Sequence, residues 1–209
     1  MAKMKRNIGD YVSGKIGNVV FVQMKGKSYV RSAPHRTNIA WSESQIYHRH
    51  KLSNVAKMWR NINSEEMKHI WKLASNDLSN YAWFVKKNIN AFSISGELID
   101  PMLIQVVDGK LTNPLFKITN AFLNSKFNIE WINDPNIKKK RLNDHLMIMT
   151  YYNNNFTSMS DTNIKRSDLT AEINKPMPDA ITQLGHVYFF FASTDNCNYS
   201  PSIHFEISY

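Results

Sequence analysis

The chain has 209 residues, of which 43% are apolar and 12% aromatic, which is enough for a packed core and excludes a globally disordered protein. Its formal net charge of +9 is unevenly placed, because residues 1–90 hold 16 Lys and Arg against 5 Asp and Glu, whereas residues 91–209 hold 10 against 12. A basic half of this kind is attracted to nucleic acid, an acidic protein surface or an anionic membrane, or it only keeps the protein in solution.

The apolar segments predict no membrane span and no Sec signal. The longest of them, such as residues 187–192, are far shorter than the roughly 20 residues of a transmembrane helix. The N-terminus is basic, but Gly9 and Asp10 stand where a signal peptide needs an apolar stretch. We therefore expect a cytoplasmic protein, or one exported by a route that needs no such signal. The single cysteine, Cys197, allows no disulfide within the chain.

Two short strands are expected near the N-terminus. Residues 18–24 are apolar and β-branched, residues 28–32 alternate, and the segment Lys25 to Lys27 supplies a turn between them. The sequence therefore predicts a β-hairpin. Four of the seven glycines precede residue 27, but their spacing matches neither the dinucleotide fingerprint nor the P-loop, so we expect no nucleotide site there.

Three amphipathic helices are expected to follow. Ser42 begins a capping-box pattern ahead of an apolar stripe, which predicts a helix over residues 43–60. Ser64 followed by two glutamates predicts a second helix that continues to Ala74. Apolar positions at helical spacing predict a third helix over residues 80–92. Together these helices form a small helical layer.

From about residue 100 the apolar period changes to two. Seven short strands are expected, at residues 104–107, 116–119, 127–131, 146–152, 169–173, 187–192 and 203–207. In the third, Phe127, Ile129 and Trp131 are expected to face inward. Strands at this spacing are typical of an antiparallel β-sandwich of the immunoglobulin or fibronectin type III class. The predicted fold is α+β, with a basic part of hairpin and helices over residues 1–97 and a β-sandwich over residues 98–209.

The sequence shows no pattern for catalysis or metal binding. His48 and His50 would point about 200° apart on a helix, whereas a shared metal needs positions i and i+4. Cys197 lies in a predicted loop near strands that carry His186 and His204, without a group that would activate its thiol. The basic run over residues 138–141 is interpreted as a solvated loop. We expect a non-enzymatic protein without catalytic residues, metal or cofactor.

Basic and aromatic residues alternate in the N-terminal half, and they are the candidate binding residues. Side chains of these two kinds can pair with phosphates and stack on bases, and they can equally contact an acidic protein. The candidates are Lys15, Lys25, Lys27, Tyr29, Arg31, Arg36, Arg49 and Lys51.

The N-terminal segments carry a family resemblance. The strings at residues 13–21 and 25–34, Ser-Gly-Lys-Ile-Gly-Asn-Val-Val-Phe and Lys-Gly-Lys-Ser-Tyr-Val-Arg-Ser-Ala-Pro, resemble the opening of a Bacteroidetes family of unknown function of about this length. The match continues at residues 81–92 and 187–202, and it departs from the family at Phe21. The segment 59–71, with a tryptophan at each end, is similar instead to hypothetical proteins of phage and prophage structural modules.

The two resemblances together imply a virion-associated or prophage-derived assembly protein with a protein partner. Two alternatives stay open. One is a periplasmic plug or accessory subunit of the type IX secretion translocon, which the missing Sec signal opposes. The other is a nucleic-acid-binding protein. The sequence leaves the oligomeric state open.

Overall fold

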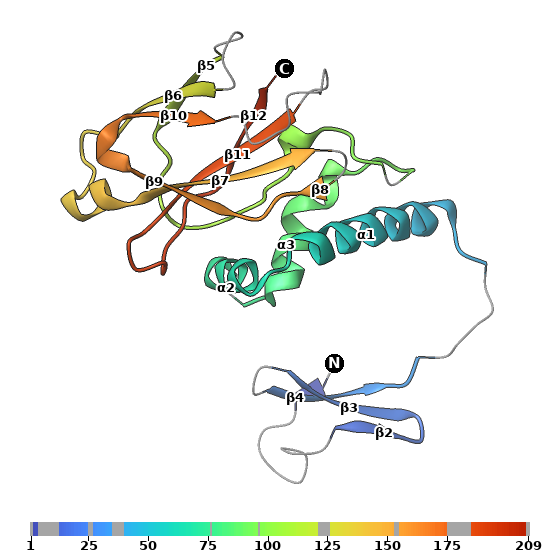
Figure 1. Cartoon of the computed structure of the whole chain (residues 1–209). Coiled ribbons are helices and arrows are strands. Elements are labelled where there is room, and N and C mark those ends of the chain that lie inside the picture. Colours follow the sequence, from blue (N-terminus) through green and yellow to red (C-terminus); the bar gives the residue numbers. More distant parts are fainter. Residues whose placement is uncertain are drawn as a thin grey trace. The chain divides into compact units, whose positions relative to one another are not determined.

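The computed structural model describes two compact units, Met1–Ser42 and Glu43–Tyr209, which are considered separately here (Figure 1). The described residues are 2–3, 13–24, 27–34, 40–75, 77–95, 97–120, 126–152, 155–174 and 185–207. The fold class is α+β, with helices and antiparallel sheets, as predicted.

The N-terminal unit contains a four-stranded antiparallel sheet. Its strands are β1 (Ala2–Lys3), β2 (Gly14–Ile16), β3 (Val19–Met24) and β4 (Lys27–Ser32), in the order β1-β4-β3-β2. The predicted hairpin is present as β3 and β4; of its predicted turn residues, Lys27 belongs to β4, and Lys25 and Gly26 lie outside the described part. Strand β2 was not predicted. It joins β3 through a two-residue turn in which Gly17 has a φ of 58°, the positive value that a type II′ turn needs at its first central position.

The three predicted helices form the beginning of the C-terminal unit. They are α1 (Glu43–Ile62), α2 (Glu65–Ala74) and α3 (Asn80–Asn88), and the 3₁₀ turn η1 (Ile89–Ala91) extends the third. The Oγ atom of Ser64 accepts a hydrogen bond from the amide of Met67 at 3.2 Å, and Ser79 caps α3 in the same way. These caps satisfy amides that have no partner within the helix, and they fix where each helix begins.

Two antiparallel sheets complete the C-terminal unit. The three-stranded sheet has the order β10-β6-β5, and the larger sheet has the order β12-β11-β7-β8, with β9 also paired to β7. The strands are β5 (Leu115–Asn120), β6 (Lys126–Ile132), β7 (His145–Tyr152), β8 (Asn155–Phe156), β9 (Ser160–Lys165), β10 (Thr170–Asn174), β11 (Gly185–Ala192) and β12 (Ile203–Ile207).

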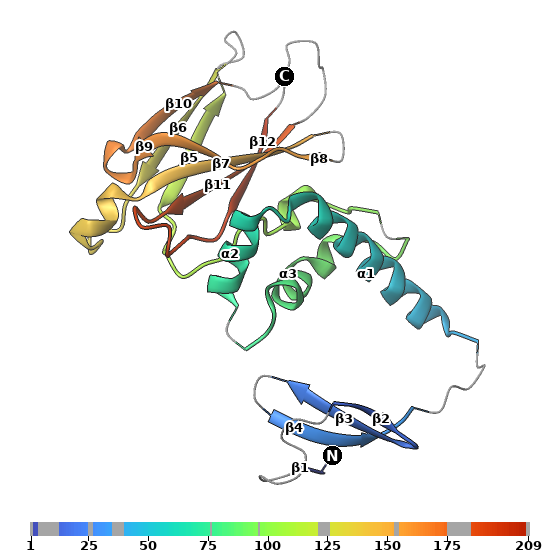
Figure 2. The same ribbon diagram turned by 60° about the horizontal axis from the view of Figure 1, so that its bottom comes forward.

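The central strands β7 and β11 are apolar on both faces. Leu146 and Ile148 of β7 and Phe189 of β11 pack with Ile129 and Trp131 of β6, between the two sheets. The alternate residues of the same strands join a second core with the helices, formed by Met147, Met149, Tyr188, Phe190, Trp59, Ile70, Trp71 and Phe84 among others. Successive side chains of a strand point to opposite faces. The larger sheet is therefore covered by the three-stranded sheet on one face and by the helices on the other (Figures 1 and 2).

Six of the seven predicted strands are present, and the prediction at residues 104–107 is wrong. This segment follows the 3₁₀ turn η2 (Pro101–Leu103) as irregular chain. Its backbone groups find other partners: the amide of Val106 donates to the Oγ of Ser202 at 3.0 Å, and the Val106 carbonyl accepts from Nε1 of Trp71 at 3.0 Å. The apolar side chains of this segment are buried although it forms no strand. Its backbone groups can be buried because these hydrogen bonds take the place of the bonds between strands.

The side-chain directions predicted for β6 are confirmed where the structure describes them. Ile129 and Trp131 are buried, whereas Asn128 and Glu130 are exposed. The chain divides after Ser42 in the structure, whereas the sequence predicts a division after residue 97. The physical reason is the shared core, since the helices cover a face of the larger sheet that would otherwise be apolar and exposed.

Candidate functional site

The register of the N-terminal sheet places four of the predicted binding residues on one face. Lys15 of β2 is opposite Val20 of β3, which is opposite Arg31 of β4. Directly opposed residues share a face, and so do residues two apart along a strand, which adds Tyr29 and Lys27 to the row. We call Lys15, Lys27, Tyr29 and Arg31 the basic face. Its three cationic side chains are exposed.

The other face of this sheet carries apolar residues beside polar ones, since the register also places Gln23, Ser28 and Ser32 on it. Ile16, Val19, Phe21 and Val30 alternate with the residues of the basic face. Ile16 is 66% exposed and Val19 38% exposed, and no side chain described within residues 13–34 is fully buried. We call these four residues the apolar face. The N-terminal sheet therefore has no buried core of its own among the described residues.

The remaining predicted binding residues do not join this face. Lys25 and Arg36 lie outside the described residues. Arg49 and Lys51 belong to α1, in the other unit. They stand on the first half of that helix, where Ile46, Tyr47 and Leu52 are also exposed. The apolar stripe predicted for α1 is thus buried only in its second half.

The C-terminal unit has a cavity of about 550 Å³ between α1, the segment around residues 92–98 and the strands β7 and β8. Met58, Phe92 and Ile104 supply apolar lining, and Lys57 and Glu97 supply charge of opposite sign. Titratable groups do not converge in it as they would around a reacting atom. It is a mixed surface hollow without an evident chemical preference.

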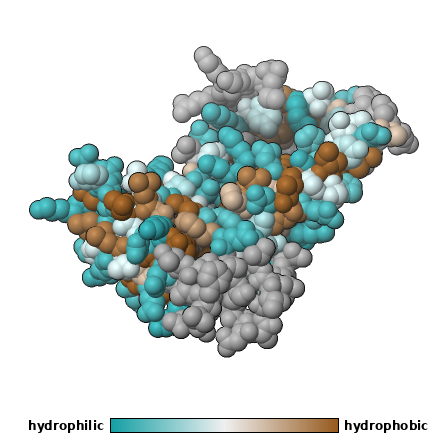
Figure 3. Space-filling model, turned by 90° about the horizontal axis from the view of Figure 1, so that it is seen from above, coloured by the Kyte–Doolittle hydropathy of each residue, from teal (hydrophilic) through white to brown (hydrophobic). Residues whose placement is uncertain are grey.

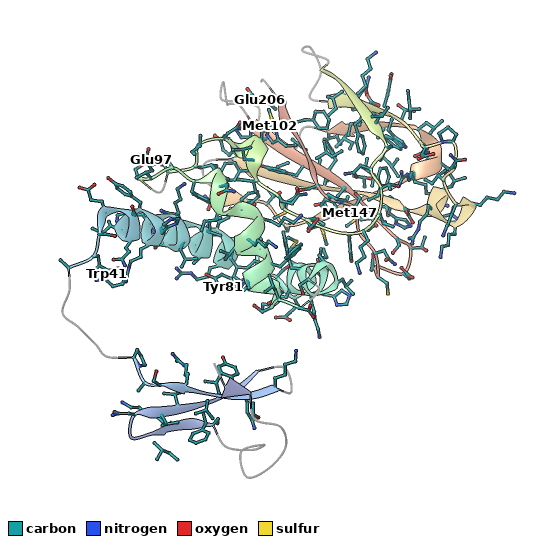
Figure 4. All side chains as sticks on the ribbon, turned by 180° about the vertical axis from the view of Figure 1, so that it is seen from behind. Trp41, Tyr81, Glu97, Met102, Met147 and Glu206 are labelled. Atoms are coloured by element: carbon teal, nitrogen blue, oxygen red, sulfur yellow. The ribbon has the colours of Figure 1, made fainter. Side chains whose placement is uncertain are left out.

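The chain segment that contributes Phe92 and Ile104 to this cavity also carries exposed apolar side chains, at Ile94, Ile99, Met102 and Leu103. On the face seen in Figure 3, apolar surface occurs in separate patches divided by polar side chains. Turn η2, which carries Met102, lies next to Glu206 of β12 (Figure 4).

A second cavity of about 410 Å³ is strongly basic. It is lined by Lys110, Leu111, Thr112, Asp134, Asn136, Ile137, Lys138, Lys140, Arg141 and Arg166. Sequence reasoning interpreted residues 138–141 as a solvated loop. The structure brings this loop together with Lys110 and with Arg166, which lies 25 or more residues away from it along the chain. The spacing carried no signal for this convergence, because it depends on how β6 and β9 end.

Cys197 and the two histidines of the C-terminal strands do not form one site among the described residues. Nδ1 of His186 lies 3.0 Å from Nε2 of His204. Cys197 is exposed and lines a different hollow with Tyr199 and Ile70. Within the described part of the chain, no group of three or more His, Cys, Asp or Glu side chains could hold a metal ion. No described helix is both long and apolar enough to span a bilayer.

The profile of a family of unknown function, DUF6266, matches residues 11–206. The chain belongs to this family. The match covers strands β2, β3 and β4 of the N-terminal sheet, the helices and nearly all of both C-terminal sheets, so it extends over parts of both units. Comparisons with curated proteins and with solved structures give no match. Membership of DUF6266 confirms the predicted resemblance to a family of unknown function.

Proposed function

We propose that this DUF6266 protein is a non-enzymatic structural or assembly protein, a virion-associated component of phage or prophage type, that binds a protein partner through its N-terminal sheet. The observation that supports this is the apolar face, whose side chains are exposed or half-buried on a sheet with no fully buried side chain among its described residues. Small isolated sheets are marginal in water, so burial against a partner stabilises such a sheet.

The edge of the sheet suggests how a partner binds. Strand β2 ends the order β1-β4-β3-β2, and all three of its residues are exposed. Gly14 of β2 has no atom within 4 Å of the position that a Cβ would take. An extended segment of a partner can add to such an edge, and the backbone then supplies the hydrogen bonds while the apolar face contributes burial.

The C-terminal unit supports the same role as a scaffold. Its two facing antiparallel sheets support the finer proposal of an immunoglobulin or fibronectin type III class, a class common in binding modules. The helices on the outer face of the larger sheet are an addition to that architecture.

Co-sedimentation tests the assembly role. The tagged full chain and a chain lacking residues 1–36 are each expressed in the cells from which the protein comes. Large particles in the lysate are then sedimented at low and at high salt concentration. We expect the full chain to sediment with particles at both salt concentrations, because strand addition depends little on charge. The truncated chain is expected in the soluble fraction, with a circular dichroism spectrum that still shows the C-terminal unit folded. Equal sedimentation of both chains would contradict the proposal.

The basic face favours a second candidate function, nucleic-acid binding. Tyr29 lies between Lys27 and Arg31 on one strand, so a stacking ring is flanked by two groups that pair with phosphates. A gel-shift titration at several salt concentrations tests it. Each phosphate contact contributes about −0.9 on duplex DNA, and about −0.7 on single strands, to the slope of log binding constant against log salt concentration.

Charge reversal at two positions locates such binding. We expect Lys27→Glu with Arg31→Glu to weaken nucleic-acid binding if the basic face is responsible. The matched control, Arg49→Glu with Lys51→Glu, changes the net charge equally on α1 and should have a smaller effect. Equal loss in both variants would indicate general attraction by a basic chain, and an absent salt slope would exclude nucleic acid as the partner.

A further inference from the structure

The basic cavity described above is built from four segments of the C-terminal unit. Lys110 and Thr112 precede β5, Asp134 and Lys138 follow β6, and Lys140 belongs to the 3₁₀ turn η3 (Lys139–Asn143). Arg166 begins the 3₁₀ turn η4 (Arg166–Asp168), directly after β9. The three lysines are exposed at the rim, Arg141 is half-buried, and Arg166 is only 1% exposed. The cationic groups therefore continue from the surface to the base of the cavity.

Arg166 is held in place by neutral acceptors. Its Nε atom donates to Oδ1 of Asn133 at 2.8 Å, and Nη1 donates to the carbonyl of Thr112 at 2.9 Å. The guanidinium lies 5.1 Å from the ring centroid of Phe191. The backbone carbonyl of Arg166 accepts a hydrogen bond from Nε1 of Trp131 at 2.9 Å. These contacts hold the side chain in one position. The Nη2 amino group of the guanidinium has no hydrogen-bond partner among the described residues.

The charge around Arg166 is not balanced. The lining contains five cationic side chains, at positions 110, 138, 140, 141 and 166, against one carboxylate, Asp134. One oxygen of Asp134 already accepts from the amide of Asn136 at 2.8 Å. The nearest buried carboxylate, Asp144, lies 3.7 Å from Arg141 and makes no ion pair with Arg166 within 4.0 Å. Burial lowers the pKa of Arg166, and the negative charges of Asp144 and Asp134 oppose this shift only in part.

A buried cation with a spare donor is costly unless an anion completes it. We propose that this cavity binds a phosphate-type anion, either inorganic phosphate or the phosphate group of a small ester or diphosphate. Arg166 and Arg141 supply directed donors at the base, where a guanidinium can bond two oxygens at once, and the three lysines act as point charges at the rim. The excess of cations favours a group of higher charge than a carboxylate. The volume of about 410 Å³ accommodates such a ligand.

The proposal is tested on the full chain by isothermal titration calorimetry. The probes are inorganic phosphate and pyrophosphate, titrated at constant ionic strength in a chloride buffer. We expect saturable binding with one site at millimolar concentrations or below. Binding of both probes indicates a site for any phosphate group, and binding of pyrophosphate alone indicates that the natural ligand carries a diphosphate. Absence of heat with both probes would overturn the proposal.

Matched lysine variants decide whether the cavity is the site. Lys138→Ala with Lys140→Ala removes two rim charges, and Lys117→Ala with Lys139→Ala removes two exposed charges that do not line the cavity. We expect the rim variant to bind phosphate at least about tenfold more weakly, because charge-assisted contacts are lost, and the control to change little. Equal weakening in both variants would show diffuse attraction and overturn the proposal.

Arg166→Gln tests the base of the cavity. The amide nitrogen of glutamine takes the place of Nε, so it can keep the bond to Oδ1 of Asn133 while the charge is removed, and circular dichroism reports whether the variant folds. If it folds, we expect phosphate binding to be lost. A folded variant with unchanged affinity would contradict the role of Arg166, and the rim variants remain decisive if it does not fold.

Discussion

The Nδ1 atom of His186 lies 3.0 Å from the Nε2 atom of His204, and these residues stand on the neighbouring strands β11 and β12. A hydrogen bond between two imidazole nitrogens needs an N–H on one ring and a bare nitrogen on the other, so it is lost when both rings are protonated. Burial lowers the pKa of both histidines, and the charge of His186 lowers that of His204 further. The carboxylates of Glu206 and Asp100 oppose these shifts.

We expect the C-terminal unit to lose stability as the pH falls below about 6.5, the ordinary pKa of histidine. The folded pKa values of His186 and His204 lie below the unfolded value, so the unfolded chain binds more protons in this range. Stability is therefore complete above the unfolded pKa and decreases as the pH falls towards the folded one. Each histidine contributes at most about 1.4 kcal/mol per pH unit. Urea unfolding between about pH 5 and pH 8 measures the slope.

A glutamine variant tests this assignment. His204→Gln keeps a polar side chain beside His186 but cannot be protonated, so we expect a smaller dependence on pH between neutrality and pH 5. His69→Gln on the exposed side of α2 serves as the control, with an unchanged slope. The same slope in the wild type and in His204→Gln would refute the role of the pair.

The division of the chain can be tested with two fragments. We expect a fragment of residues 43–209 to unfold in one cooperative transition. A fragment of residues 98–209 lacks the helices and leaves Met147, Tyr188 and Phe190 exposed, so we expect it to bind the dye ANS or to aggregate. A soluble, cooperative fragment 98–209 would show instead that the sheets form a core without the helices.

Local signals in the sequence explain why most elements could be predicted. Ser64 followed by two glutamates predicts the start of α2, and the structure shows the corresponding cap. The strands β5, β6, β10 and β12 follow from short alternating runs. In each case the deciding interactions lie within a few residues or in one repeated pattern, which the sequence displays directly.

Elements that depend on distant partners were missed. Strand β9 is polar and half exposed, and it forms because β7 offers it an edge. The unbroken apolar runs of β7 and β11 indicate burial on both faces of these strands. The three-stranded sheet packs on one face, and the helices pack on the other. The basic cavity was missed for the same reason, since Lys110, Lys138 and Arg166 meet only after the sheets have formed.

Phe84 connects two helices, and its removal should be costly. Its ring centroid lies 4.9 Å from that of Trp59 and 5.0 Å from that of Trp71, and the side chain is fully buried. We expect Phe84→Ala to lower the free energy of unfolding by about 3–5 kcal/mol. Leu78→Ala, at an exposed position, should change it by less than about 0.5 kcal/mol. Equal effects in a urea titration would show that the packing of Phe84 contributes little.

Gly109 marks a close approach between the segment after η2 and the loop after β11. A Cβ at this position would lie within 2.6 Å of two backbone atoms of Tyr199, its carbonyl carbon and oxygen. Backbone atoms cannot rotate away, and the Tyr199 carbonyl is held because it accepts a hydrogen bond from the amide of Leu111 at 3.0 Å. The neighbouring Asp108 bonds Nε1 of Trp83 at 2.8 Å, so a shift of Gly109 disturbs the contact with α3 as well.

We therefore expect Gly109→Ala to lower the free energy of unfolding by about 1–3 kcal/mol or more, as overpacking does. Gly17→Ala is the matched control. Its φ of 58° strains an alanine by about 1–2 kcal/mol, but nothing lies within 4 Å of the new Cβ, and the residue belongs to the N-terminal sheet. Four of the five tryptophans lie in the C-terminal unit, so unfolding followed by tryptophan fluorescence reports mainly on that unit. Gly109→Ala should move this transition and Gly17→Ala should leave it in place; an unmoved transition in Gly109→Ala would mean that the two backbone segments can separate at little cost.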